Sequence, residues 1–153
     1  MTTAKERFKL IPAVYLILRK GDEVLLLQRA NTGYQDGKYS LVSGHLDGDE
    51  LATHGLAREA KEEAGVTVRP QDLVLVHTVH RLSRNQNNQE RMDLFFETTQ
   101  WEGKITNIEP DKCSDLRWFD INHLPDATIP LVRQVLEAVA RGGHYSEYIK
   151  EPV

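Results

Sequence analysis

Residues 44–66 read GHLDGDELATHGLAREAKEEAGV and are the most informative stretch of the chain. The stretch opens with a short loop that is rich in glycine and acidic residues. Residues 51–64 are then predicted to form a helix from their periodicity. Gly65 is placed to end it, because glycine readily adopts the left-handed conformation found just after a helix. The stretch is therefore predicted to be a loop followed by a helix of about four turns.

The predicted helix carries three glutamates on one face. Side chains three and four positions apart on a helix are neighbours, so Glu59, Glu62 and Glu63 are expected to lie within an arc of roughly 100°. Crowded carboxylates repel one another unless a cation compensates, and Mg2+ is typically held by a few carboxylates plus substrate phosphates. Arg58 is placed to orient one of them, since its planar fork can hold a carboxylate in fixed geometry. The alternative is a solvated helix face, as most charge runs are.

The full pattern favours the first interpretation, because it resembles the Nudix box of the MutT-like Nudix hydrolase superfamily. The fixed positions of that box are occupied here by Gly44, Glu50, Arg58, Glu59, Glu62, Glu63 and Gly65, and its aliphatic positions by Ala60 and Val66. Ala60 is smaller than the usual aliphatic residue, which points to close packing of the helix on a sheet. Tyr39 stands where many members have Trp, and Ser-Gly-His at 43–45 replaces the commoner Pro-Gly-Gly.

The resemblance implies an α/β/α sandwich, an α+β fold with a mixed central β-sheet and two main helices. It also implies hydrolysis of a diphosphate linkage that depends on Mg2+, with Mn2+ as an alternative. The implied metal ligands are Glu59, Glu62 and Glu63, joined by the carbonyl group of Gly44, and Arg58 would orient Glu59. Glu50 is expected to support the loop, since an acid near a helix start also has a structural reason to be there.

Two parts of the chain could supply the catalytic base. The first choice is Glu59 or Glu63 on the helix itself. The second is Glu109, in the acidic segment 108–115, where some members place a further acid; a solvated turn containing Pro110 is the alternative for that segment.

Two residues outside the box are candidates for substrate binding. Arg29 could contact a phosphate, and His80, together with Arg81, could touch phosphate or base. For each residue the alternative is a role without function, because surface arginines are abundant and a lone histidine is more often structural. No histidine lies at a sequence spacing from Cys113 that would indicate a catalytic partner, so a nucleophilic role is not expected.

The rest of the chain is predicted to be a mixture of strands and one further helix. Strands are expected at residues 8–18, 23–28, 39–42, 92–97 and 116–119, one strand or two at 66–79, loops at 31–38 and 81–91, and a helix at 129–140.

Composition excludes several classes of protein. With 153 residues, 40% hydrophobic and 27% charged, the chain is expected to be one globular domain over residues 1–153. A net charge of −4 argues against a stable nucleic-acid partner. No apolar run approaches the roughly 20 residues that span a bilayer. The polar N-terminus lacks a signal-peptide core, and the single cysteine cannot form an internal disulfide, so a cytoplasmic location is expected.

The substrate is expected to be a small nucleotide, but the box binds only the shared diphosphate. A nucleoside triphosphate, cleaved to monophosphate and pyrophosphate, is favoured by the short single domain, by the absence of an added N-terminal domain, and by the likeness of residues 107–118 to some members. The alternatives are an ADP-ribose or nucleotide-sugar diphosphatase and a nucleotide-sensing regulatory Nudix domain without activity. Homodimers are common among relatives, so a homodimer is an open expectation.

Overall fold

The computed structural model of the protein describes residues 4–84 and 89–150. In chain order its elements are β1 (Ile11–Lys20), β2 (Glu23–Arg29), β3 (Tyr39–Ser40), β4 (Val42–His45), α1 (Ala52–Ala64), a 3-10 turn η1 (Pro70–Asp72), β5 (Val74–Ser83), β6 (Arg91–Thr98), β7 (Cys113–Asp120), α2 (Pro130–Ala140) and β8 (Tyr145–Lys150).

Within the described residues, the strands form one mixed sheet. Its main path runs β3-β2-β1-β6-β5-β8, with β4 attached to β1 and β7 to β2. The pairs β1–β6 and β5–β8 are parallel, and the other pairs are antiparallel. The loop before α1 leaves the sheet from β4, which pairs with β1, so the box begins at the middle of the sheet.

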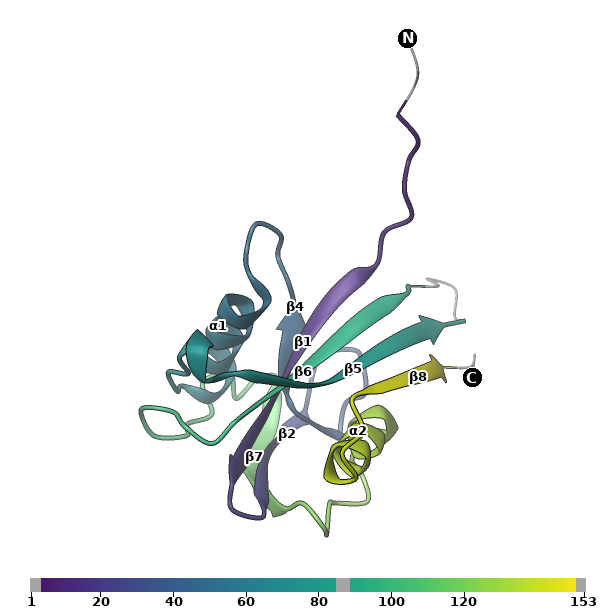
Figure 1. Cartoon of the computed structure of the whole chain (residues 1–153). Coiled ribbons are helices and arrows are strands. Elements are labelled where there is room, and N and C mark those ends of the chain that lie inside the picture. The colour runs from purple at the N-terminus through teal and green to yellow at the C-terminus, as the bar shows by residue number, and fades with distance from the viewer. Residues whose placement is uncertain (1–3, 85–88, 151–153) are drawn as a thin grey trace.

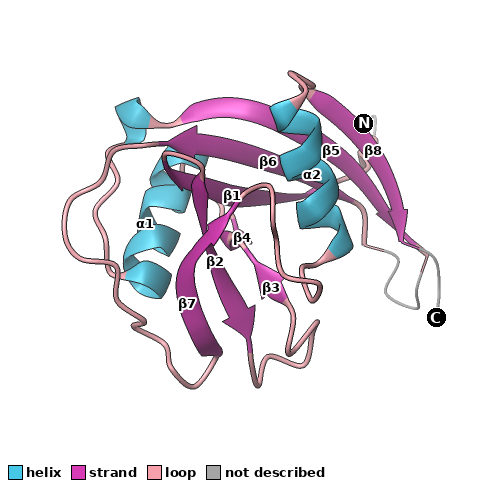
Figure 2. Cartoon of the chain, turned by 90° about the horizontal axis from the view of Figure 1, so that it is seen from below, coloured by secondary structure: helices cyan, strands magenta, loops and turns pink. Residues whose placement is uncertain are grey.

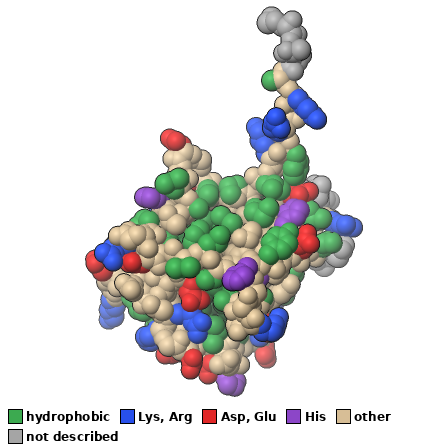
Figure 3. Space-filling view, in the orientation of Figure 1, with side chains coloured by type: hydrophobic (Ala, Val, Ile, Leu, Met, Phe, Trp, Pro, Cys, Tyr) green, Lys and Arg blue, Asp and Glu red, His purple; other side chains and the backbone are tan. Residues whose placement is uncertain are grey.

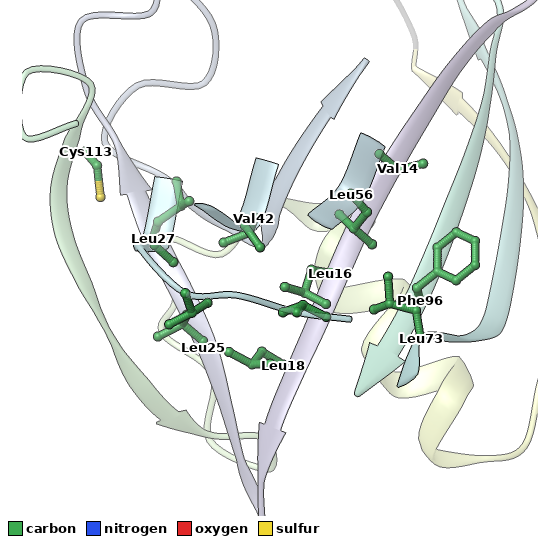
Figure 4. Packing of buried hydrophobic residues seen from close by; sticks show 14 residues of the cluster. Val14, Leu16, Leu18, Leu25, Leu27, Val42, Leu56, Leu73, Phe96 and Cys113 are labelled. Atoms are coloured by element: carbon green, nitrogen blue, oxygen red, sulfur yellow. The ribbon is translucent and has the colours of Figure 1, made fainter. Parts of the chain in front are cut away.

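The two helices cover opposite faces of this sheet (Figures 1 and 2). α1 packs through Leu56, Ala60 and Ala64 against one cluster of buried side chains, which includes Leu16 and Phe96 and is shown in part in Figure 4. α2 packs against a second cluster on the other face, with Val135 and Leu136 beside Ile17, Val79 and Phe95. The expected α/β/α sandwich with a mixed sheet and two main helices is confirmed.

Three expectations about local structure need correction. The predicted loop at 81–91 is shorter, because β5 continues to Ser83 and pairs with β6 up to Arg81↔Arg91; residues 85–88 of that loop lie outside the described residues. The predicted strand at 39–42 divides into β3, which pairs with β2, and β4, which pairs with β1. β8 was not predicted, since its pairing with β5 joins residues far apart in sequence.

The surface of the body mixes apolar and charged side chains (Figure 3). The segment from Ala4 to Leu10 projects away from the body, and its Phe8 is 75% exposed (Figures 1 and 3). No helix in the described part of the chain is long and apolar enough to cross a membrane.

Candidate active site

Helix α1 presents its glutamates to one cavity because its other face is fixed in the core. Leu56, Ala60 and Ala64 are fully buried against the sheet. The helix ends at Gly65, which adopts a left-handed conformation (φ 71°) and donates its N–H to the carbonyl of Lys61. The glutamates of this helix therefore lie at the border between the packed face and solvent.

Gly44 and Glu59 lie in very close contact. A Cβ atom at Gly44 would lie 2.3 Å from both Cδ and Oε1 of Glu59, a separation that real Cβ atoms do not tolerate. Only glycine allows the carboxyl group of α1 to approach the backbone of β4 here. This contact brings Glu59 next to the backbone of Gly44. Two of the four predicted metal ligands are therefore neighbours.

Arg58 is the centre of an acidic network. Its Nη1 donates to Glu59 Oε1 at 2.9 Å and lies 3.4 Å from Glu62 Oε2. Its Nη2 lies 3.0 Å from Glu50 Oε2 and 3.1 Å from Asp47 Oδ2. These contacts, with Glu50 first, raise the pKa of Arg58 above its usual value. The guanidinium therefore orients Glu59 and at the same time ties the loop before α1 to the helix.

Glu50 has the contacts of a loop-supporting side chain. Its Oε2 accepts a hydrogen bond from the backbone N–H of Asp47 at 2.7 Å, in addition to the contact with Arg58. The hydrogen bond with Arg58 is the first cause that lowers the pKa of Glu50. Gly55 leaves room for this arrangement, since a Cβ there would lie 3.1 Å from Glu50 Cδ and 2.6 Å from a methyl group of Leu46.

Glu63 is the most deeply enclosed of the glutamates. Its Oε2 accepts a hydrogen bond of 3.3 Å from the backbone N–H of Ser43. Burial, followed by the charge of Glu59, raises the pKa of Glu63 to about 8. Burial also raises the pKa of Glu59, although the neighbouring Arg58 opposes this. Both carboxylates are thus costly to ionise until a cation lies beside them.

A single cavity of about 730 Å³ collects the predicted acidic groups. It is lined by Gly44, Glu59, Glu62, Glu63 and Glu109, together with the cationic side chains of Arg29, Lys112, Arg81 and Arg91. Glu109 reaches it because the loop before β7 folds back on itself: the Glu109 carbonyl accepts hydrogen bonds from the N–H groups of Lys112 (2.9 Å) and Cys113 (3.0 Å). The cavity therefore brings acidic and cationic side chains together.

The acidic side chains of the cavity fit a divalent cation by their chemistry. Buried carboxylates whose ionisation is opposed by burial and by one another are the oxygen donors that Mg2+ or Mn2+ would stabilise. Among residues 4–84 and 89–150, however, no group of three or more His, Cys, Asp or Glu side chains is already arranged to hold a metal ion. Arg58 instead holds Glu59 and approaches Glu62, so metal binding would require these side chains to turn away from it.

The two candidate substrate-binding residues lie in different surroundings. Arg29 lines the cavity, but its Nε donates to the Tyr34 carbonyl (2.8 Å) and its Nη2 to Thr32 Oγ1 (3.1 Å), so it supports its own loop. His80 is not among the side chains that line the cavity; its Nε2 lies 3.0 Å from Glu90 Oε2. Arg81, next along β5, points to the cavity instead, because neighbouring residues of a strand face opposite sides.

Residues of β6 at the cavity were missed from sequence. Arg91 lines it, and Asp93 forms an ion pair with Arg81 at 3.0 Å. The available signal was the alternation of Arg91 and Asp93 with apolar residues at the start of a predicted strand. It could be interpreted only once the register with β5 was known.

Comparison with known proteins agrees with this architecture. Residues 9–139 match the model of the NUDIX domain family. The crystal structure of a MutT NUDIX hydrolase from Burkholderia pseudomallei superposes with a TM-score of 0.76 at 22% identity, covering 85% of this chain and 98% of that one. A MutT protein from Methanosarcina mazei gives 0.72 at 23% identity, covering 90% and 97%.

Curated relatives are longer than this chain. The NAD-capped RNA hydrolase NudC of Stutzerimonas stutzeri is 28% identical over 117 residues, which are 76% of this chain and 39% of that protein. NudC of Pseudomonas entomophila is 29% identical over the same shares. The chain thus spans about two fifths of the length of these relatives. The match to the family model covers most of the sequence and includes the whole glutamate helix, and the chain therefore belongs to the NUDIX domain family of Nudix hydrolases.

Proposed function

We propose that the chain hydrolyses a diphosphate linkage in a nucleoside diphosphate compound, with Mg2+ or Mn2+ bound by Glu59, Glu62, Glu63 and the carbonyl group of Gly44. The observation that carries the proposal is that these groups line one cavity, with Glu59 pressed against Gly44 and Glu63 enclosed beside it. When bound, the metal would polarise phosphoryl oxygens and lower the pKa of a water molecule.

The side chains around the proposed metal ligands have different roles. Arg58 sets the direction of Glu59 through its 2.9 Å contact, and Glu50 holds the preceding loop. Lys112 and Arg29 line the cavity and add positive charge near a bound polyphosphate. Such preorganised charges are the main means by which proteins accelerate phosphoryl transfer.

The base that activates water has two candidate locations. Glu59 and Glu63 lie on α1, while Glu109 lies on the loop across the same cavity. The variant Glu109→Gln distinguishes these two locations, because Glu109 is not among the proposed metal ligands. If Glu109 is the base, kcat falls by about 100-fold or more while Mg2+ affinity is kept. If kcat is kept, the base lies on the helix.

The favoured substrate is a nucleoside triphosphate, cleaved to a monophosphate and pyrophosphate. The second candidate is a diphosphatase acting on ADP-ribose, a nucleotide sugar or a dinucleotide. It is favoured by the likeness to NudC, whose name states an NAD-capped substrate, although the likeness spans only 39% of that protein. A nucleotide-sensing domain without activity is less favoured because the box is intact. A single domain over residues 1–153, a homodimer and a cytoplasmic location stay predictions.

The test is a Mg2+-supplemented assay of purified protein against nucleoside triphosphates, ADP-ribose, NADH and NAD-capped RNA, with both products identified. Release of pyrophosphate from a nucleoside triphosphate supports the first candidate. Release of AMP from ADP-ribose or NADH, or of nicotinamide mononucleotide from NAD-capped RNA, supports the second. Glu62→Gln/Glu63→Gln should abolish turnover while the melting curve shows a folded protein. Turnover that persists in this double variant would show that the ligand assignment is wrong.

A further inference from the structure

Part of the cavity lining comes from four neighbouring strands, β4, β1, β6 and β5. Ala13 of β1 pairs with His45 of β4 on one side and with Asp93 of β6 on the other. Two residues along β6, Arg91 pairs with Arg81 of β5. Paired residues of neighbouring strands point to the same face, as do residues two apart on one strand. These strands therefore bring two arginines and one aspartate to a single face.

Arg81 and Asp93 form a buried and incompletely bonded pair. The Arg81 side chain is 8% exposed and that of Asp93 is 0% exposed. Arg81 Nη2 donates to Asp93 Oδ1 at 3.1 Å, and Arg81 Nε forms an ion pair with Asp93 Oδ2 at 3.0 Å, but among residues 4–84 and 89–150 neither Nε nor Oδ2 has an aligned hydrogen-bond partner. Burying charges costs several kcal/mol per ion, which the attraction between the two charges has to offset. A face with only a packing role would be expected to carry apolar residues here.

Arg91 adds a second positive charge without a second acid. Its Nη1 donates to His45 Nε2 at 3.1 Å and its Nη2 to Gln89 Oε1 at 3.2 Å. Within residues 4–84 and 89–150, no carboxylate forms an ion pair with Arg91. Like charges directly opposite one another on neighbouring strands are destabilising. The Arg81–Arg91 pair thus leaves an excess positive charge in the cavity lining, which an anion would neutralise.

These arginines adjoin the proposed metal site. His45, which contacts Arg91, directly follows Gly44, and successive residues of a strand are only about 3.3 Å apart. Gly44, Glu63, Arg81 and Arg91 line the same cavity. A ligand with several phosphoryl groups could therefore contact the proposed metal site and these arginines at once. Guanidinium groups suit this role because their planar forks donate two hydrogen bonds to one phosphate.

We propose that Arg81 and Arg91 form a phosphate subsite, which binds a phosphoryl group of the substrate other than the two joined by the scissile linkage. The subsite rests on the proposed function, since it extends the same cavity. Asp93 is a positioning residue that holds Arg81 in the cavity lining. The phosphoryl group has two possible sources, the terminal phosphate of a nucleoside triphosphate or a phosphate ester on the sugar of a dinucleotide.

The kinetic experiment compares substrates that differ by one phosphate. Wild-type protein, Arg91→Gln and Arg91→Lys are assayed with Mg2+ on ATP against ADP, and on NADPH against NADH. Arg91→Gln should lower the kcat/KM ratio within one pair by roughly 10-fold or more, as expected for one lost charge-assisted contact. The pair affected identifies the source of the phosphate. Arg91→Lys should restore part of the ratio.

Arg69→Gln is the matched control. Arg69 is a surface arginine paired with an acid, Asp72, and it lies outside this cavity. It should leave both ratios unchanged. Ratios that are the same in Arg91→Gln and wild-type protein, for both substrate pairs, would overturn the subsite.

A binding experiment decides the subsite without turnover. Inorganic tripolyphosphate is titrated calorimetrically into the full chain in EDTA, where proposed metal ligands cannot contribute through a cation. Wild-type protein and Arg69→Gln should bind it alike, and Arg91→Gln roughly 10-fold more weakly. Absence of binding by wild-type protein, or equal binding by Arg91→Gln, overturns the subsite. Failure of every substrate to be hydrolysed would instead contradict the proposed function and leave this result standing.

Discussion

Glu59 occupies the space that a side chain at Gly44 would need, with its Oε1 only 2.3 Å from where a Cβ would lie. Gly44→Ala should therefore displace Glu59 and lower kcat by about 100-fold or more, because misplacement by about 1 Å can cost this much. The measurement is kcat at saturating Mg2+, with circular dichroism to show that the fold is kept. Shortening the acid in Gly44→Ala/Glu59→Asp should recover thermal stability lost in the single variant. A single variant with wild-type kcat would contradict the close-contact role.

Metal-free protein should lose stability as pH rises, and Glu63 should be one cause. Its pKa is raised from 4.5 to about 8, so between these values the folded state keeps a proton that the unfolded state has lost. The free energy of unfolding must then fall as pH rises through this range, by up to roughly 4 kcal/mol. Urea denaturation in EDTA at pH 5.5, 7 and 8.5 measures this slope.

Glu63→Gln is the control for that slope, because glutamine does not titrate. The variant should show a flatter profile and, at pH 8.5, should exceed wild-type protein in stability. Saturating Mg2+ should also flatten the wild-type profile. An identical slope in the two metal-free proteins would show that Glu63 is not responsible.

Glu50 and Glu62 should differ in what their loss affects. Glu50 accepts hydrogen bonds from the Asp47 N–H and from Arg58, so Glu50→Gln should lower the free energy of unfolding. Its Mg2+ affinity should stay near that of wild-type protein. Glu62, whose side chain is 49% exposed, should show the reverse: weaker Mg2+ binding in Glu62→Gln with little change in stability. Calorimetric Mg2+ titration and urea denaturation of both variants test the contrast.

Removing one partner of the buried Arg81–Asp93 pair should cost more than removing both. Arg81→Met leaves the fully buried Asp93 carboxylate unpaired, which should lower the free energy of unfolding by about 3–5 kcal/mol. Arg81→Met/Asp93→Val should recover most of that loss. Urea denaturation of the three proteins gives the comparison. A double variant no more stable than Arg81→Met would show that the unpaired Asp93 carboxylate is not the cause of the lost stability.

The glutamate helix could be predicted from sequence because its determinants are local. The spacing of Glu59, Glu62 and Glu63 fixes a shared face, and Gly65 adopts the left-handed conformation expected after a helix. The family resemblance added the partner Gly44 and the sandwich fold, both of which depend on contacts that spacing alone does not specify. The predicted bounds of the helix, 51–64, differ from the observed Ala52–Ala64 by one residue.

Tertiary structure alone decided which groups face the cavity beyond the helix. His80 and Arg81 are neighbours in sequence, yet only Arg81 lines the cavity, because strand residues alternate between faces and the face is set by pairing with β6. Arg91 and Asp93 joined Arg81 through that same register. By itself, the sequence determined the glutamate helix, since helical contacts are local. The placement of Arg81 and Arg91 in the cavity depends on strands whose pairing is non-local, so only the folded chain could reveal it.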